Sequence, residues 1–267
     1  MQRLLITGGA GKVAALLRPR IVHPDRTVRL LDIVPPAEIA DGEEFIQGSL
    51  TNRALLDEAL KGVDAIIHLG GQSRESDARD VLESNMYGTY LLFEAAREAG
   101  IKRVVLASSN HAAGFYTRSS EVLPAGLSGR ADTIYGWSKV AMEALGRLYV
   151  DRFGMDVICL RIGLWFHVPP GLRGLAMWLS PDDGARLVEA CLSAPSPGFR
   201  IVWGISRNTR RWWSLAEGEA LGYFPQDDAE QFAEKFIAEY GEPDWVNDPI
   251  LNRVGGQWCD IPLGKPY

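Results

Sequence analysis

The first third of the sequence opens with an apolar stretch, a glycine-rich turn and a second apolar stretch that ends in an acid. Residues 4–16 read Leu-Leu-Ile-Thr-Gly-Gly-Ala-Gly-Lys-Val-Ala-Ala-Leu, the pattern of a buried strand that turns into an apolar helix. Twenty-one residues after Gly11, the run Leu30-Leu31-Asp32 places a carboxylate at the end of the second apolar stretch. This arrangement predicts a βαβ unit, and therefore a parallel sheet covered by helices.

The glycine spacing of this turn, Gly8-x-x-Gly11-x-x-Ala14, is typical of dinucleotide-binding loops. Glycine lets the backbone approach a pyrophosphate, whose charge is held by N–H groups and the positive end of the helix. Asp32 falls where a carboxylate can accept hydrogen bonds from both adenosine ribose hydroxyls and would repel a 2′-phosphate. Arg29 precedes the acid, and nothing basic directly follows it. We therefore predict that Gly8, Gly11 and Asp32 bind NAD rather than NADP.

Apolar strand-like stretches alternate with helical stretches through residue 163. Strands are predicted near residues 3–6, 27–32, 44–46, 64–69, 103–107 and 156–162. Helices are predicted near residues 11–22, 51–60, 78–99 and 134–153. This alternation predicts the α/β class, with a Rossmann-type, doubly wound parallel sheet and helices on both faces.

After residue 163 the sequence becomes richer in Trp, Pro and Gly. A short helix near 182–193 and a strand near 199–204 are predicted between two irregular segments, 164–181 and 205–267. Ligands of open parallel sheets lie beyond the carboxyl ends of the strands, so we expect the irregular segments to cover that edge and shape a substrate pocket. The chain is expected to form a single domain, 1–267, whose dinucleotide-binding core comprises about 1–163 plus 182–204.

Composition excludes several classes of function. A net charge of −6 without a basic run argues against a nucleic-acid surface. The three cysteines and four histidines stand in no metal-ligand spacing, so no metal site is predicted. Because no apolar run approaches the length of a membrane span and the first strand starts at once, we expect a cytoplasmic protein without a membrane partner.

A second group of polar residues follows the predicted strand near 103–107. Ser109 lies two residues after this apolar stretch, and Tyr135 and Lys139, four residues apart, share one face of a predicted helix. Removing a hydride from an alcohol carbon requires loss of the hydroxyl proton, and a phenol with a pKa of about 10 is a weak base at neutral pH. A nearby ammonium stabilises the phenolate and lowers that pKa. A serine hydroxyl can hold the substrate oxygen in line.

Together, these residues resemble the short-chain dehydrogenase/reductase superfamily in its epimerase-like, extended branch. Over nearly its full length the chain is similar to the uronate dehydrogenase family within that branch. The stretches that carry this similarity are His68-Leu-Gly-Gly71 with Ser73, Ala107-Ser-Ser-Asn-His111, Tyr135-Gly-x-Ser-Lys139, Arg161-Ile-Gly163, Arg173 before Met177-Trp-Leu-Ser180, and Val202-Trp-Gly204 with Trp212-Trp213. The resemblance implies NAD-dependent oxidation of D-glucuronate or D-galacturonate at C1 to an aldarolactone.

The resemblance also implies roles for individual residues. Tyr135 would be the catalytic base, Lys139 would tune it and bind the nicotinamide ribose, and Ser109 would orient the C1 oxygen. Contacts to the substrate are implied for Ser73, Ser109, Asn110, His111 and Arg173. Arg173, in a loop-like stretch, would hold the carboxylate, which a planar guanidinium can grip through two hydrogen bonds. Expected cofactor contacts are Gly8, Gly11, Lys12, Val13, Asp32, Ser49, Leu50, Leu69, Gly70, Gly71, Asn85, Tyr135 and Lys139.

Three positions depart from the family pattern. Leu164 stands where the family has a serine that helps to bind in the site, so affinity or substrate choice can differ. Ser49 replaces the acid of an Asp-Leu pair that usually meets adenine, and Ala14 replaces the last glycine of the turn.

Other functions are compatible with the same residues. A neutral aldose dehydrogenase and a nucleotide-sugar epimerase or dehydratase belong to the same superfamily, and a non-catalytic NAD-binding regulatory protein belongs to another class. A nucleotide-sugar enzyme needs a larger region after residue 163 than this chain offers. We expect a small sugar-acid substrate, no nucleic-acid partner and a homo-oligomer.

Overall fold

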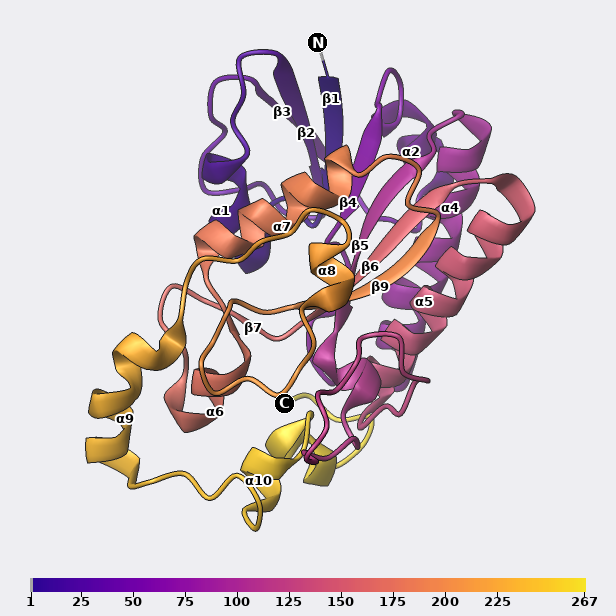
Figure 1. Ribbon diagram of the computed structural model, residues 1–267. Coiled ribbons are helices and arrows are strands. Elements are labelled where there is room, and N and C mark those ends of the chain that lie inside the picture. Colours follow the sequence, from indigo (N-terminus) through magenta and orange to yellow (C-terminus); the bar gives the residue numbers. More distant parts are fainter. Residues whose placement is uncertain (1) are drawn as a thin grey trace.

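A seven-stranded parallel sheet runs through the computed structural model, which describes residues 2–267 (Figure 1). Its strand order is β3-β2-β1-β4-β5-β6-β9, and each neighbouring pair is parallel. The strands are β1 (Gln2–Thr7), β2 (Arg26–Asp32), β3 (Glu43–Gln47), β4 (Ala65–His68), β5 (Arg103–Ser109), β6 (Asp156–Ile162) and β9 (Phe199–Gly204). All seven predicted strands form, and the doubly wound α/β fold is confirmed.

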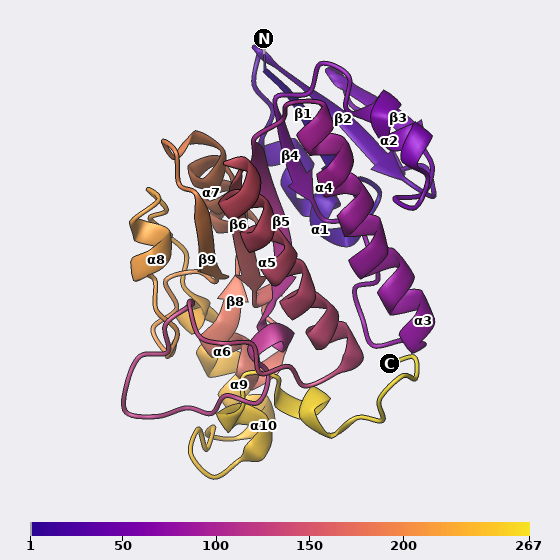
Figure 2. The same cartoon turned by 90° about the vertical axis from the view of Figure 1, so that its right-hand side faces the viewer.

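Helices cover both faces of the sheet (Figures 1 and 2). On one face α1 (Lys12–Leu17) and α7 (Pro181–Ser193) pack on a core that includes Leu4 and Ile6 of β1. On the other face, α2 (Arg53–Ala59), α4 (Gly88–Glu98) and α5 (Ile134–Phe153) share a core with Leu5. Successive side chains of a strand point to opposite faces, so β1 contributes to both cores.

The helix predicted over 78–99 is interrupted. It consists of α3 (Ala78–Val81), a wider π-helical turn, η2 (Leu82–Tyr87), and α4. The helix predicted over 11–22 is shorter than expected, because α1 passes into the 3₁₀ turn η1 (Arg18–Arg20) that contains a proline. Proline lacks the N–H that would continue the α-helical hydrogen-bond pattern.

The segments expected to be irregular contain more regular structure than the sequence indicates. A short parallel sheet joins β7 (Leu164–Trp165) to β8 (Trp178–Leu179), with α6 (Gly171–Met177) between them. The remaining elements are α8 (Ala216–Glu219), η4 (Ala229–Phe232), α9 (Ala233–Tyr240), α10 (Pro249–Asn252) and η5 (Gly256–Asp260). Helices α6 and α9 pack together through a separate apolar cluster that includes Leu175 and Phe236.

The segment from α10 onward lies beyond the carboxyl ends of β5 and β6, as both views show (Figures 1 and 2). This is the edge where ligands of open parallel sheets bind. Between residues 2 and 267, no helix is long and apolar enough to cross a membrane.

Candidate active site

The turn between β1 and α1 needs glycine at its first position. Gly8 has a φ of +68°, and a Cβ there would lie 2.8 Å from the backbone nitrogen of Gly70. Gly11 is the N-cap residue of α1, and its N–H donates to the carbonyl of Gly8 over 3.0 Å. The turn after β1 therefore packs directly against the loop after β4, with no side chain between the two backbones.

Asp32 ends β2 beside this turn. One carboxylate oxygen accepts from the backbone N–H of Ala10 at 3.0 Å, and the other from that of Val34 at 3.3 Å. Arg29, the base that precedes it, is directed elsewhere: its guanidinium lies 2.8 Å from Glu44 and donates to the carbonyl of Ala59 at 2.7 Å. Within residues 2–267 Asp32 forms no ion pair, so its charge remains available to ribose hydroxyls.

The other residues expected to contact the cofactor differ in how far they are buried. Lys12 and Gly71 are exposed, Val13 and Leu69 are partly buried, and Gly70 is buried. The hydroxyl of Ser49 lies 2.8 Å from that of Thr51, and the side chain of Leu50 is in the core. A contact between the Ser49 hydroxyl and a cofactor would therefore compete with a bond inside its own turn.

Asn85, on the π-helical turn η2, joins two segments of the site. Its Oδ1 accepts from the N–H of Gln72 at 2.7 Å, and its Nδ2 donates to Ser138 of α5 at 2.9 Å. Gly71, with a φ of +134°, has no room for a Cβ because Asn85 Oδ1 occupies that space. Asn85 thus fixes the loop after β4 against the helix that carries Tyr135.

Tyr135 and Lys139 lie on one buried face of α5, as their spacing predicted. The ammonium of Lys139 lies 5.5 Å from the centroid of the Tyr135 ring and donates to the carbonyl of Ala107 at 2.9 Å. Burial lowers the pKa of Lys139 to about 8 and raises the pKa of Tyr135 to about 12. The nearby Ser109 hydroxyl acts to lower the pKa of Tyr135 but does not outweigh its burial.

A buried ion pair lies one helical turn beyond Lys139. Glu143 accepts from Arg161 through both carboxylate oxygens, at 2.9 and 2.8 Å, and from Ser108 at 2.6 Å. The charge of Glu143 acts to raise the pKa of Lys139 against the effect of burial. Glu143 therefore helps to keep Lys139 protonated at neutral pH.

Three consecutive side chains from 109 to 111 lie at the carboxyl end of β5. The hydroxyl of Ser109 accepts from the N–H of His111 at 3.2 Å and caps a 3₁₀ turn, η3 (Asn110–Ala113). Asn110 donates to the carbonyl of Val254 at 3.0 Å. The ring of His111 lies 5.9 Å from that of Tyr135, so this stretch lies beside the predicted base.

Arg173 lies on α6 rather than in a loop, which corrects the expectation from sequence. Its Nη2 donates to the carbonyl of Val254, the same atom that binds Asn110. Its Nε is buried and has no hydrogen-bond partner within residues 2–267. Burial lowers the pKa of Arg173 to about 10, so the side chain is still a cation at neutral pH.

Two predicted positions contribute differently. Ser73 is exposed on the loop after β4, and the structure gives its hydroxyl no hydrogen bond within the described range. Leu164, where the family pattern has serine, is partly buried and packs against the core below α7. Leu164 therefore supplies apolar packing in place of a hydroxyl.

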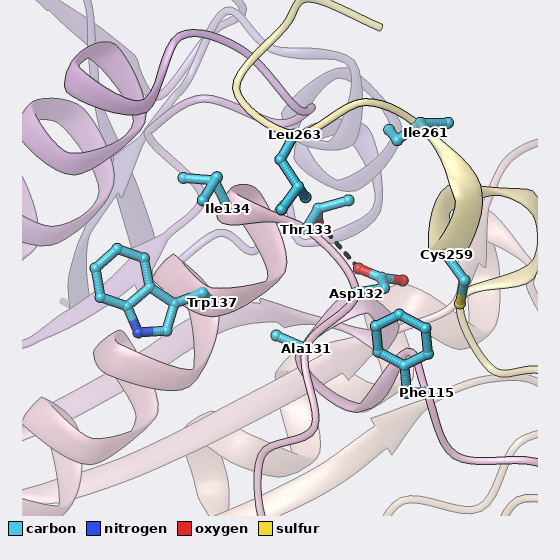
Figure 3. Close-up of a pocket in the computed structure, with 9 residues that line it drawn as sticks. All are labelled: Phe115, Ala131, Asp132, Thr133, Ile134, Trp137, Cys259, Ile261 and Leu263. Atoms are coloured by element: carbon cyan, nitrogen blue, oxygen red, sulfur yellow. Dashed lines mark hydrogen bonds between the residues drawn. The ribbon is translucent and has the colours of Figure 1, made fainter.

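Sequence reasoning missed Asp132, Glu75 and Trp258. Asp132 Oδ2 lies 2.7 Å from His111 Nδ1, and Thr133 donates to Asp132 Oδ1 at 3.0 Å (Figure 3). Trp258 of η5 stacks on His111 with ring centroids 4.1 Å apart. Thr133 caps the helix of Tyr135, and this capping position just after Asp132 was the local signal available.

A pocket of about 390 Å³ opens beside the first turn of α5 (Figure 3). Asp132 lies in its wall, between the helix that carries Tyr135 and the segment after η5. The lining residues are Phe115, Ala131, Asp132, Thr133, Ile134, Trp137, Cys259, Ile261 and Leu263.

Known proteins share both the fold and much of the sequence. Residues 4–167 match the NAD dependent epimerase/dehydratase family. A uronate dehydrogenase of Pseudomonas putida is 42% identical, over 96% of this chain and 95% of that protein. The structure of a uronate dehydrogenase mutant from Agrobacterium tumefaciens, complexed with NAD, is 38% identical, with 98% of both chains covered and a TM-score of 0.91. A glucuronic acid dehydrogenase from Chromohalobacter salexigens is 38% identical, with 98% and 97% covered and a TM-score of 0.92.

The chain belongs to the NAD dependent epimerase/dehydratase family, among its uronate dehydrogenases, and is an NAD-dependent dehydrogenase. The resemblance inferred from the sequence is thereby confirmed, and so is NAD as the cofactor.

Proposed function

We propose that this dehydrogenase oxidises C1 of a hexuronic acid, D-glucuronate or D-galacturonate, and releases an aldarolactone. The observation that carries the proposal is the partly buried guanidinium of Arg173, whose one hydrogen bond within residues 2–267 goes to the Val254 carbonyl that also binds Asn110. A buried cation without a full set of partners is costly, and a carboxylate can satisfy it through charge-assisted bonds. A neutral sugar would leave that cost in place.

The residues of the turn after β1 fit NAD. The close approach of Gly8 to Gly70 leaves backbone, not side chains, at the place where a pyrophosphate binds. The unpaired carboxylate of Asp32 fits two ribose hydroxyls. When bound, NAD⁺ supplies the acceptor for the hydride that leaves C1.

The chain itself would orient the sugar and move one proton. Ser109 would hold the C1 oxygen, and Tyr135 would accept the proton of the C1 hydroxyl while C1 loses its hydride. C1 of a pyranose also carries the ring oxygen, so oxidation there gives an ester within the ring, a lactone, without a further bond change. Arg173 would hold the carboxylate on C5, which lies across the ring oxygen from C1, and Asn110 and His111 would contact ring hydroxyls.

Lys139 would make Tyr135 a better base. Burial, together with the charge of Asp132, raises the pKa of Tyr135 and makes the phenolate unfavourable. The charge of Lys139, 5.5 Å from the centroid of the Tyr135 ring, would stabilise the phenolate that proton transfer requires. The hydrogen-bonded pair Glu143–Arg161 lies one helical turn beyond Lys139 and holds the carboxylate of Glu143 in place.

The test is NADH formation with four sugars in parallel: glucuronate, galacturonate, glucose and galactose. We expect turnover with at least one uronate at a kcat/KM well above that of the neutral sugar with the same ring stereochemistry. Comparable efficiency with glucose or galactose would instead favour a neutral aldose dehydrogenase, the alternative that the apolar Leu164 suggests.

A further inference from the structure

Asp132 and His111 form a buried pair on the substrate side of Tyr135. Asp132 Oδ2 lies 2.7 Å from His111 Nδ1, the Asp132 side chain is 0% exposed and the His111 side chain is 10% exposed. The ring is held from two further sides, by stacking on Trp258 and by the edge of Tyr135. The other ring nitrogen, Nε2, makes no hydrogen bond within residues 2–267.

Asp132 is itself fixed by glycines from three separate parts of the chain. A Cβ at Gly114 or at Gly255 would overlap Oδ2, and a Cβ at Gly136 would lie 3.0 Å from Oδ1. The hydroxyl of Thr133 donates to Oδ1 at 3.0 Å. The carboxylate is therefore held in one position, and its Oδ2 lies 2.7 Å from His111 Nδ1.

We propose that Asp132 is a positioning residue that keeps the neutral imidazole of His111 protonated on Nδ1, so that Nε2 accepts a hydrogen bond from a hydroxyl of the substrate. A carboxylate accepts hydrogen bonds but donates none, so it selects the ring form with the proton on the nitrogen facing it. The remaining nitrogen then carries a lone pair. This inference rests on the proposed function for the identity of the sugar, although the protonation of the ring can be observed without it.

The groups that face His111 favour a neutral ring. Burial and the charge of Arg173 lower the pKa of His111, whereas Asp132 and Glu75 raise it, and burial is the largest influence. The Tyr135 phenol and the indole of Trp258 complete the surroundings without adding a charge at neutral pH. An uncharged imidazole beside Arg173 also avoids repulsion with the cation that would hold the carboxylate.

The direct test is the ¹H–¹⁵N NMR spectrum of histidine side chains in the whole protein at neutral pH. The chain has four histidines, and a His111→Gln variant identifies the signals that belong to position 111. We expect nitrogen shifts of a neutral ring with its proton on Nδ1. A ring protonated on Nε2, or on both nitrogens, overturns the inference. This measurement needs no variant of Asp132 and no substrate.

Asp132→Asn tests the positioning role. The amide of asparagine can either donate or accept a hydrogen bond, so we expect His111 to lose its preference for a proton on Nδ1. Because the substitution also removes the negative charge of Asp132, we expect the pKa of His111 to fall. KM for the uronate should rise about five- to tenfold, because a weakly oriented ring gives up about one neutral hydrogen bond, while NADH binding measured by fluorescence stays unchanged. The matched control is Asp182→Asn. Asp182 lies on the distant helix α7, and its carboxylate pairs with Arg20.

The two proposals fail in distinguishable ways. Unchanged histidine signals and unchanged KM in Asp132→Asn would show that Asp132 does not position the ring, whatever the substrate. A wild-type protein that shows the expected ring protonation yet oxidises no uronate would refute the proposed function and leave the role of Asp132 intact.

Discussion

The backbone N–H of Tyr135 donates to the carboxylate of Glu75 over 2.8 Å, across sixty residues of sequence. The other oxygen of the same carboxylate accepts from the N–H of Gly264 at 2.7 Å, and the Glu75 carbonyl accepts from Tyr267. Glu75 is 1% exposed. One buried side chain thus joins the loop after β4, the first turn of α5 and the segment that covers the site.

Glu75→Ala should loosen this junction. One buried and one partly buried N–H group would lose their acceptor, so we expect the free energy of unfolding to fall by about 2–4 kcal/mol, at about 1–2 kcal/mol for each group. Urea denaturation measures the loss, and kcat should fall as well because Tyr135 is less fixed. Glu83→Ala, an exposed glutamate on the neighbouring turn η2, should change neither quantity. Wild-type stability in Glu75→Ala would argue against the junction.

Tyr135→Phe should keep the fold and the affinity for NAD and lose most turnover. It removes the hydroxyl that we propose as the proton acceptor, and removal of a general base typically costs about 10²–10⁴ in rate. Steady-state kinetics gives kcat, and tryptophan fluorescence on NADH addition checks that the cofactor still binds. Turnover within a few-fold of wild type would show that another group takes the proton.

The activity should depend on pH through Lys139. The pKa of Lys139 is lowered to about 8, so the ammonium is charged below that pH and neutral above it. The pKa of Tyr135 lies higher, so its phenolate fraction grows as pH rises. We expect kcat/KM to increase with pH up to about 8 and then level off as the stabilising charge is lost.

Lys139→Met should remove this levelling and lower kcat/KM at neutral pH, whereas Lys139→Arg, which keeps the charge, should retain part of the activity. The measurement is kcat/KM as a function of pH for the wild type, Lys139→Met and Lys139→Arg. Superimposable profiles for the wild type and the methionine variant would mean that Lys139 does not tune the base.

Arg173→Ala tests whether the enzyme recognises the carboxylate of an acid sugar. Charge-assisted hydrogen bonds contribute about 1.5–3 kcal/mol, so KM for uronates should rise by about tenfold or more while NAD binding is unchanged. Any residual oxidation of glucose or galactose should show no comparable defect. Arg173→Lys keeps the charge but not the two-pronged geometry and should be intermediate. A variant that handles uronates as well as the parent would remove the support for a carboxylate contact.

Asp32→Ala should shift cofactor preference from NAD⁺ toward NADP⁺. The carboxylate has no ion-pair partner between residues 2 and 267, so its charge both attracts ribose hydroxyls and repels a 2′-phosphate. The ratio of kcat/KM for the two cofactors measures the effect. Arg29→Ala is a useful comparison, because Arg29 pairs with Glu44 and should leave the ratio unchanged. Equal efficiency of the wild-type enzyme with both cofactors would contradict this assignment.

Local patterns in the sequence were sufficient for the dinucleotide half of the molecule. The strand that ends at Thr7, the glycine turn and Asp32 are close in sequence, and their geometry follows from residue type. Tyr135 and Lys139 could also be placed on one helical face, because four residues make about one turn of a helix. The pKa of Tyr135 could not be predicted this way, since it depends on how deeply the ring is buried.

The substrate half depends on contacts between distant residues. The stretch around Arg173 has two glycines and follows two prolines, so its helix propensity is low. It becomes helical in the presence of α9, whose Phe236 shares an apolar cluster with Leu175. The pairs Asp132–His111 and Glu75–Tyr135 join residues 21 and 60 positions apart, and no local spacing reveals them.

The carbonyl oxygen of Val254 anchors both Asn110 and Arg173, and it belongs to the backbone. A substitution at position 254 changes the side chain but keeps the carbonyl oxygen. Point variants would therefore alter the residues around the site and leave this hydrogen-bond acceptor in place. To move that anchor, an engineer has to insert or delete residues between α10 and η5. We therefore expect changes in the length of this connection, more than changes in its composition, to open the enzyme to sugars of different size.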